Sequence, residues 1–333
     1  MAQSSRKIVL LKQPQYALRH VYCVLSARSL PYARHCLASL LRNAIEPLSI
    51  TLITDEAEDR VLLQEAMTSV DNPAQHDWCI LIKDDVDRIA EQRLAEYPAV
   101  RAFRDGHPCW RKITDPALMA ESGEEVIILD PDVYFPNQFC FEPTPKTGIY
   151  LMWQRPNCLL PEATVRSAFE QGISMADHTD IGVAQFSESL DWGHLDTLIE
   201  RLGGANLPRS MHVESIVWAE LAVTMGGKHL NPEAWRCFDN SVLTRIRTKL
   251  GKPGYATIAA LDIKNMKCLH GGGVAKNWFP EAEQRGLLDT RVRLEQTASG
   301  RPYLPFLRSK FEQKFALRRK AAKLGLYRII GGE

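Results

Sequence analysis

Short apolar segments rich in β-branched residues alternate with longer segments of helical periodicity through the first half of this 333-residue chain. The apolar segments predict buried strands, which we expect at residues 21–25, 48–54, 78–82, 126–129 and 148–152. Helices are expected between them, at residues 32–43, 56–67 and 86–103, the last with a break near its end at Pro98. Strands joined through helices favour parallel pairing, with both sheet faces covered. The pattern therefore predicts an α/β fold with a mostly parallel central sheet.

The composition is that of a globular protein, with 45% hydrophobic and 24% charged residues. These values exclude collagen-like, coiled-coil and largely disordered chains. Length alone suggests two domains, but α/β enzymes often exceed 250 residues as one domain. We expect a single domain at residues 18–290 and a separate C-terminal segment at residues 291–333. The net charge of +1 gives no overall field that would indicate a nucleic-acid partner.

The N-terminal residues lack the long apolar run and the cleavage site of a signal peptide, and no segment has the apolar length of a transmembrane helix. The eight cysteines have no zinc-site spacing, and several lie in apolar runs where a reduced thiol behaves as a small hydrophobe. We therefore expect a cytoplasmic protein with reduced cysteines.

The stretch VIILDPDVYF is the most informative, because a buried strand runs directly into Asp130 and Asp132. Open α/β sheets bind ligands at the carboxyl ends of their strands. Two neighbouring carboxylates repel each other, and a hard divalent cation such as Mg²⁺ or Mn²⁺ removes that repulsion and bridges to substrate phosphates. An Asp-Pro-Asp turn without a metal is the alternative. The position directly after the strand favours the metal site.

A second stretch, KCLHGGGVAKNWF, contains His270, Gly273 and Lys276. A neutral imidazole can complete the shell of a cation, glycine N–H groups can approach phosphate oxygens, and a lysine ammonium can meet the phosphate charge. A glycine-rich loop with an incidental histidine and a solvated lysine is the alternative, and for this segment taken alone it is favoured.

Taken together, the two stretches resemble glycosyltransferase family 8. The H-x-x-G-x-x-K-x-W spacing of residues 270–278 is similar to the C-terminal motif of that family, and VIILDPDVYF is similar to its metal-binding strand end. The resemblance covers residues 20–280. It implies a GT-A fold, Rossmann-like and single-domain, with Mn²⁺ or Mg²⁺ held by Asp130, Asp132 and His270.

Weaker matches add further candidates and some departures. Asp180 stands where the family has Asn, and Glu214 with Ser215 stands where it has an acidic–amide pair. Lys112 ends a Trp-Arg-Lys segment that resembles a basic donor contact, and Asn277 replaces the family's Pro. The changes at Asp180 and Glu214 concern residues nearest the reacting carbon, so the donor sugar, the acceptor and the stereochemical course stay open.

The implied activity is transfer of a sugar from a nucleotide-diphosphate donor, expected to be a UDP-sugar, to a carbohydrate, glycolipid or protein acceptor. Retention of configuration is implied, whereas an inverting enzyme would need a carboxylate base such as Asp180 or Glu214. The loop after the first strand lies at the ligand-binding edge and would contact the nucleotide. The implied catalytic residues are Asp180, Glu214 and Lys276, and the implied donor-binding residues are Ser26, Ala27, Arg28, Lys112, Asp130, Gly273 and Lys276.

Two other functions stay open. A sugar-1-phosphate nucleotidyltransferase also places carboxylates at strand ends, but it carries a glycine-rich loop after its first strand, and LSARSLPYARH contains no glycine. A non-catalytic module that only holds a nucleotide-sugar is kept open by the changes at Asp180 and Glu214. The intact segment 270–276 argues against such a module.

The last part of the chain is strongly basic. Residues 300–333 contain nine basic and two acidic residues, a net charge of +7 that leaves −6 for the rest of the chain. Residues 304–330 predict a basic amphipathic helix, with an apolar stripe at Leu307, Phe311, Phe315, Leu317, Ala321 and Leu324. One interpretation is peripheral contact with an anionic membrane at its inner face. The other, slightly favoured, is packing on the acidic domain.

Overall fold

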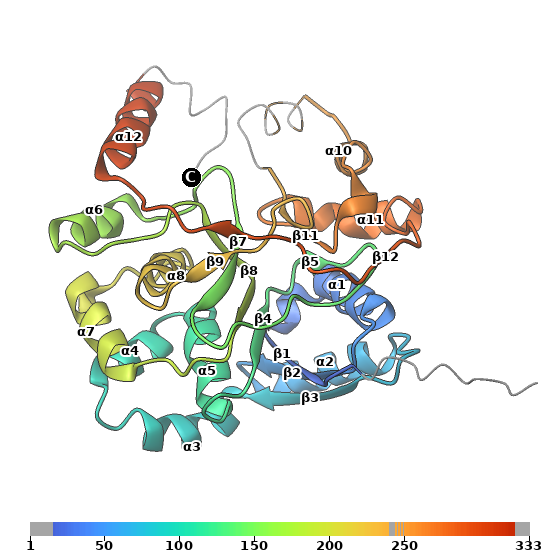
Figure 1. Ribbon diagram of the computed structural model, residues 1–333, viewed down its shortest axis with the longest axis horizontal. Coiled ribbons are helices and arrows are strands. Elements are labelled where there is room, and N and C mark those ends of the chain that lie inside the picture. Colours follow the sequence, from blue (N-terminus) through green and yellow to red (C-terminus); the bar gives the residue numbers. More distant parts are fainter. Residues whose placement is uncertain (1–15, 240–243, 245, 247, 249, 324–333) are drawn as a thin grey trace, which may run out of the picture.

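The computed structural model describes residues 16–239, 244, 246, 248 and 250–323, which form an α/β structure around one central sheet (Figure 1). Its strands follow the order β3-β2-β1-β4-β8-β7-β10-β11-β5, β9 pairs with both β7 and β13, and β6 pairs with β12 in a small separate sheet. The strands are β1 Arg19–Val24, β2 Leu48–Thr54, β3 Asp77–Ile82, β4 Val126–Leu129, β5 Val133–Tyr134, β6 Gln138–Phe139, β7 Ile149–Trp153, β8 Thr179–Phe186, β9 Gly227–His229, β10 Trp235–Cys237, β11 Cys268–His270, β12 Arg293–Leu294 and β13 Arg301–Pro302. The helices are α1 Leu30–Asn43, α2 Ala57–Thr68, α3 Lys83–Arg93, α4 Pro98–Gly106, α5 Arg111–Met119, α6 Glu162–Glu170, α7 Trp192–Leu202, α8 Val213–Thr224, α10 Gly254–Ile258, α11 Phe279–Gln284 and α12 Arg308–Lys323.

Strands β1 to β4 form one parallel part of the sheet, with β1 between β2 and β4. The pairs β7–β9, β7–β10 and β10–β11 are also parallel. Alternate residues of β1 enter different cores: Val21 and Cys23 pack with α1 and α2, while Tyr22 and Val24 pack with α3, α4 and α5 on the other face (Figure 1). This two-sided burial explains the continuous apolar runs of these strands. The expected α/β class and mostly parallel central sheet are confirmed, as are the five expected strands to within two residues at each end.

The break expected at Pro98 in the helical segment 86–103 is present, but it separates two helices, α3 and α4, where one interrupted helix was predicted. Pro98 occupies the first turn of α4. Proline has no N–H and is tolerated there but not in a helix interior, so the chain ends one helix before Pro98 and begins another with it.

Strand β8 lies at the centre of the sheet and was not predicted. It runs antiparallel to both β4 and β7, and all eight of its residues are buried. Its sequence TDIGVAQF mixes apolar residues with Asp180, Gly182 and Gln185, which removes the uninterrupted apolar run that identified the other buried strands. The reversed direction brings the beginning of β8 beside the end of β4.

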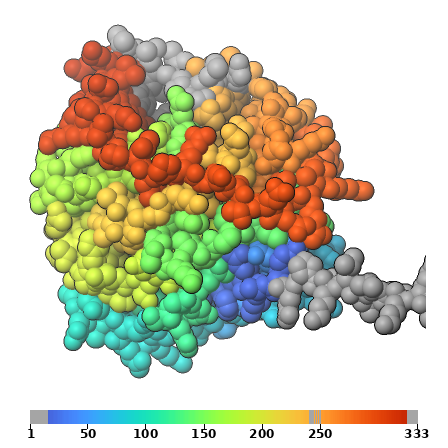
Figure 2. Space-filling model, in the orientation of Figure 1, coloured from blue at the N-terminus to red at the C-terminus, as the bar shows by residue number. Residues whose placement is uncertain are grey.

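The segment after α11 crosses one face of the molecule before it forms α12 (Figures 1 and 2). Phe311 and Phe315 on α12 are buried in the same core as α6, α7 and α8, whereas Leu307 and Leu317 of the predicted stripe are exposed. The helix predicted from residue 304 begins at Arg308, so residues 304–307 are not helical, and residues 324–330 of the prediction lie outside the described residues. Among the helices that the structure describes, none combines the length and the apolar character needed to span a bilayer.

Candidate metal and phosphate site

Asp130 and Asp132 lie at the carboxyl end of β4, in the turn between β4 and β5. The N–H of Asp130 donates to the carbonyl of Gly182 at 2.9 Å, which ties this turn to β8. The N–H of Gly271 donates to the carbonyl of Asp132 at 2.8 Å, which ties it to the end of β11. The turn that carries the two carboxylates is therefore tied to β8 and to the end of β11.

His270 is the last residue of β11 and lies between three carboxylates. Its Nε2 is 3.2 Å from Asp132 Oδ1 and 3.6 Å from Asp130 Oδ2. Its Nδ1 is 2.8 Å from Asp180 Oδ1 on β8. The structure therefore brings together two residues predicted as metal ligands, Asp130 and Asp132, with the third, His270.

The donor atoms of Asp130, Asp132 and His270 all lie within 4.8 Å of one another. Burial lowers the pKa of His270, but the charges of Asp180 and Asp132 outweigh it, and the net pKa is well above its ordinary value. Burial raises the pKa of Asp132, but His270 and Lys276 outweigh it and hold that pKa low. Asp180 and Asp132 thus favour a positive charge on the His270 imidazole between them. Two carboxylates and an imidazole are a suitable donor set for a divalent cation, so these residues fit the implied metal.

Lys112 forms a second charged group beside Asp130. Its Nζ is 2.7 Å from Asp130 Oδ1 and 2.7 Å from Glu214 Oε1, and all three side chains are largely buried. Lys112 comes from the first turn of α5 and Glu214 from the first turn of α8. Burial raises the pKa of Glu214 to about 8, with Lys112 partly opposing the shift, and its Oε2 has no hydrogen-bond partner among the described residues. The Lys112 ammonium thus contacts two buried carboxyl groups, those of Asp130 and Glu214.

Lys276 lies on the other side of the pair. Its Nζ donates to Asp132 Oδ2 at 3.2 Å and lies over the ring of Tyr32, 4.7 Å from the ring centroid. Burial lowers the pKa of Lys276, but Asp132 outweighs it and the net pKa is raised. Gly273, with a φ of +67°, makes the turn that brings Lys276 back, so that its N–H donates to the carbonyl of Gly271 at 2.8 Å. Each of the two aspartates therefore carries one lysine.

The predicted nucleotide-contacting residues Ser26, Ala27 and Arg28 lie in the turn after β1. The N–H of Ala27 donates to Asp59 Oδ2 at 3.0 Å, and the carbonyl of Ser26 accepts from Ser29 at 2.9 Å. Arg28 is exposed. These contacts shape the turn itself and do not join it to the two aspartates.

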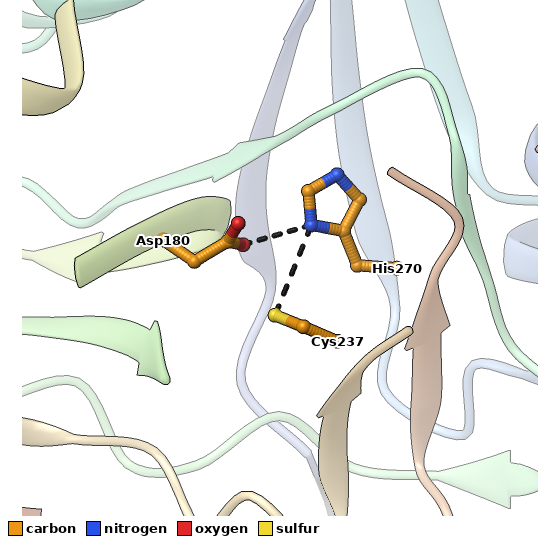
Figure 3. A group of neighbouring side chains, drawn as sticks. All are labelled: Asp180, Cys237 and His270. Carbon is orange, nitrogen blue, oxygen red and sulfur yellow. Dashed lines mark hydrogen bonds and ion pairs between the residues drawn. The ribbon is translucent and has the colours of Figure 1, made fainter. Parts of the chain in front are cut away.

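Asp180 and Cys237 flank the other nitrogen of His270 (Figure 3). Asp180 also accepts from the N–H of Gly182 at 2.9 Å, and burial, which raises its pKa, is outweighed by His270, so that its pKa is lowered. Cys237 Sγ is 3.9 Å from His270 Nδ1. Asp180, predicted as a catalytic residue, is thus placed as a partner of the imidazole.

Sequence reasoning missed Cys237 because β10 has only three residues and gives no periodic signal. It also gave no role to Gly182. A Cβ at residue 182 would lie 2.6 Å from His270 Nδ1, so only glycine lets β8 approach the imidazole this closely.

No protein-family model matches this sequence, and no curated protein matches it. Several solved structures are similar in fold. Mouse xyloside xylosyltransferase 1 in its apo form is 14% identical, with 77% of this chain and 98% of that chain covered and a TM-score of 0.49. The galactosyltransferase LgtC with donor and acceptor sugar analogues is 10% identical, with 81% and 100% covered and a TM-score of 0.44. The mannosyltransferase Ktr4p from S. cerevisiae is 10% identical, with 63% and 65% covered and a TM-score of 0.37. All three are glycosyltransferases, and the similarity is one of overall chain path.

Proposed function

We propose that this chain is a metal-dependent glycosyltransferase that uses a nucleotide-diphosphate sugar, with Mn²⁺ or Mg²⁺ held by Asp130, Asp132 and His270. The observation that carries the proposal is the meeting of these three donors at strand ends, with Lys112 on one carboxylate and Lys276 on the other. Carboxylates that bind a cation, beside lysines that bind anions, suit a metal-bound diphosphate.

The reaction breaks the bond between the sugar and the β-phosphate, so negative charge grows on the departing diphosphate. A bound divalent cation would stabilise that charge. Lys276 supplies a further positive charge and is partly exposed, so it can leave Asp132 for a phosphate oxygen. Burial raises the pKa of Asp130, and Lys112 opposes that rise and orients the carboxylate. These fixed charges lower the barrier because they are in place before the charge develops.

The state of the two candidate bases supports retention of configuration. An inverting enzyme needs an ionised carboxylate that takes the proton of the acceptor hydroxyl. Glu214, with a pKa of about 8, is largely protonated at neutral pH, and Asp180 is engaged by His270. In a retaining reaction with attack from the same face, the departing phosphate takes that proton, so neither carboxylate has to act as a base.

The test is incubation of the full chain with Mn²⁺ and a panel of nucleotide-diphosphate sugars, with the phosphate products measured. We expect slow release of nucleoside diphosphate from one donor, because transferases hydrolyse their donors in the absence of an acceptor. Pyrophosphate formation in the presence of nucleoside triphosphate and sugar 1-phosphate would indicate a nucleotidyltransferase instead. Donor binding without either product would indicate the non-catalytic module.

Two histidine substitutions, one at the site and one away from it, test the proposed metal site. His270→Ala removes the imidazole ligand and should abolish Mn²⁺-dependent diphosphate release. His194→Ala removes a histidine on α7 that contacts Glu220 at 3.0 Å, away from the site, and should leave release unchanged. Equal release by wild type and His270→Ala would refute the proposed metal site.

A further inference from the structure

The surroundings of His270 Nδ1 form a second group of metal donors, distinct from Asp130 and Asp132. Asp180, Cys237 and His270 each offer one ligand atom, and these atoms lie within 4.8 Å of one another. The three residues come from β8, β10 and β11 and point toward one another (Figure 3). This group contains a thiol, which the first group lacks.

The sheet holds these donors in place. Cys237 and His270 are register partners on the parallel strands β10 and β11, and the N–H of Phe238 donates to the carbonyl of His270 at 2.9 Å. The carboxylate of Asp180 is held by the N–H of Gly182. Because the donors sit on paired strands, little ordering is needed when an ion binds.

The donor chemistry selects a different metal from the one at the first group. Thiolate, imidazole and carboxylate together are ligands of Zn²⁺, whereas Mg²⁺ and Mn²⁺ prefer oxygen. Three protein ligands leave a fourth tetrahedral position for water. We propose that Asp180, Cys237 and His270 Nδ1 bind Zn²⁺, and that this binding displaces the divalent cation from Asp130 and Asp132.

The two sites exclude each other because they share one imidazole. When Nδ1 carries its proton and donates it to Asp180, the lone pair of the neutral ring is on Nε2, facing Asp130 and Asp132. When Zn²⁺ binds Nδ1, the remaining ring proton is on Nε2, and no lone pair is left for the other cation. From this neutral ring, zinc binding releases the thiol proton of Cys237 to solvent, and the ring proton moves from Nδ1 to Nε2 by exchange with solvent. The displacement rests on the proposed function, whereas the zinc site does not.

Cobalt is the probe for the second site, because Co²⁺ bound to thiolate gives a near-ultraviolet charge-transfer band that oxygen and nitrogen ligands do not give. The metal-stripped full chain titrated with Co²⁺ should show this band, and Zn²⁺ should abolish it. The band should be lost in both Cys237→Ser and Cys237→Ala. It should be kept in Cys79→Ser, which removes an exposed thiol on β3. A wild type without the band, or a band that survives both Cys237 substitutions, would overturn the zinc site.

Electron paramagnetic resonance of free Mn²⁺ tests the displacement. We expect Zn²⁺ to weaken Mn²⁺ binding by about tenfold or more in the wild type and in Cys79→Ser. In Cys237→Ser, Mn²⁺ binding without zinc should be unchanged, and zinc should weaken it by less than about twofold. Equal displacement in Cys237→Ser would mean competition at Asp130 and Asp132 and would overturn the inference. A cobalt band that needs Cys237, in a chain that does not bind Mn²⁺, would instead refute the proposed function and leave the zinc site standing.

Discussion

The two nitrogens of His270 face different surroundings. On the Nε2 side lie two carboxylates, each with its own lysine, and the carboxylates come from a turn between strands. On the Nδ1 side lie one carboxylate, one thiol and a glycine backbone, all on strands of the sheet. On the Nε2 side, a bound cation or phosphate can replace partners in the Lys112–Asp130 and Lys276–Asp132 ion pairs. On the Nδ1 side, the contacts hold the imidazole ring in one orientation. Substitutions on the two sides should therefore differ in kind.

The largest effect should come from Lys112→Met, on the Nε2 side. It leaves Asp130 and Glu214 buried without their shared cation, and breaking a buried ion pair by removing one partner costs about 3–5 kcal/mol. Urea unfolding measures the loss. Replacing Glu214 by Gln in the same chain should recover little of it, because Glu214 is already largely protonated at neutral pH and Asp130 is the charge left unpaired. A Lys112→Met protein as stable as the wild type would mean that this charge is not needed for folding.

The next largest effect comes from replacing one aspartate on each side of the His270 ring. Asp132→Asn removes a ligand charge on the Nε2 side, whereas Asp180→Asn keeps an oxygen that can accept from Nδ1. Changes to residues that only orient a ligand cost about 10–100-fold in metal affinity. We therefore expect Asp132→Asn to weaken Mn²⁺-dependent UDP binding by more than about 100-fold and Asp180→Asn by about tenfold. Isothermal titration measures both, with exposed Asp84→Asn as the control.

If Asp180→Asn weakened binding as much as Asp132→Asn does, Asp180 would be a direct ligand and not a positioning residue. The contrast between the two sides of the imidazole would then be wrong. Asp180→Ala extends the test, because it removes the accepting oxygen and should bind Mn²⁺ more weakly than Asp180→Asn.

The Nε2 side was more accessible to sequence reasoning than the Nδ1 side. Asp130 and Asp132 follow VIIL, a strand that is buried on both faces. Both the strand and the position of the two aspartates at the ligand-binding edge of the sheet could therefore be predicted. Asp180 lies inside β8, a buried strand whose polar residues interrupt the apolar run by which strands were recognised. It was named as a candidate only through the family resemblance. Cys237 lies on a three-residue strand without periodicity, and its approach to His270 depends on pairing between distant segments. Local sequence patterns show which residues follow a buried strand, but they do not show which distant segments pair with each other.

The pH dependence of stability tests the burial of Glu214. Because its pKa is raised to about 8 from an ordinary 4.5, the native state binds this proton more tightly than the unfolded state between those values. The stabilisation is therefore complete below pH 4.5 and is lost as the pH rises through 8, with a maximal slope of about 1.4 kcal/mol per pH unit. Glu214→Gln should remove this decline, as measured by urea unfolding across that range. A wild type whose stability does not decline there would mean that Glu214 is ionised in the fold.

The smallest effect should come from Lys276→Ala, because Lys276 is partly exposed and its chain can move. Its charge matters most when the diphosphate departs, so turnover should fall by about tenfold while the donor dissociation constant changes by less than about threefold. The matched control is Lys228→Ala, which removes another lysine that lies over an aromatic ring, that of Tyr150, at 4.9 Å. Steady-state donor hydrolysis and direct donor titration separate the two quantities. Equal losses in turnover and binding would indicate that Lys276 holds the donor from the start and adds nothing specific to the transition state. An unchanged Lys276→Ala protein would make this lysine a surface partner of Asp132 and leave Lys112 as the cation of the Nε2 side that acts on the reaction.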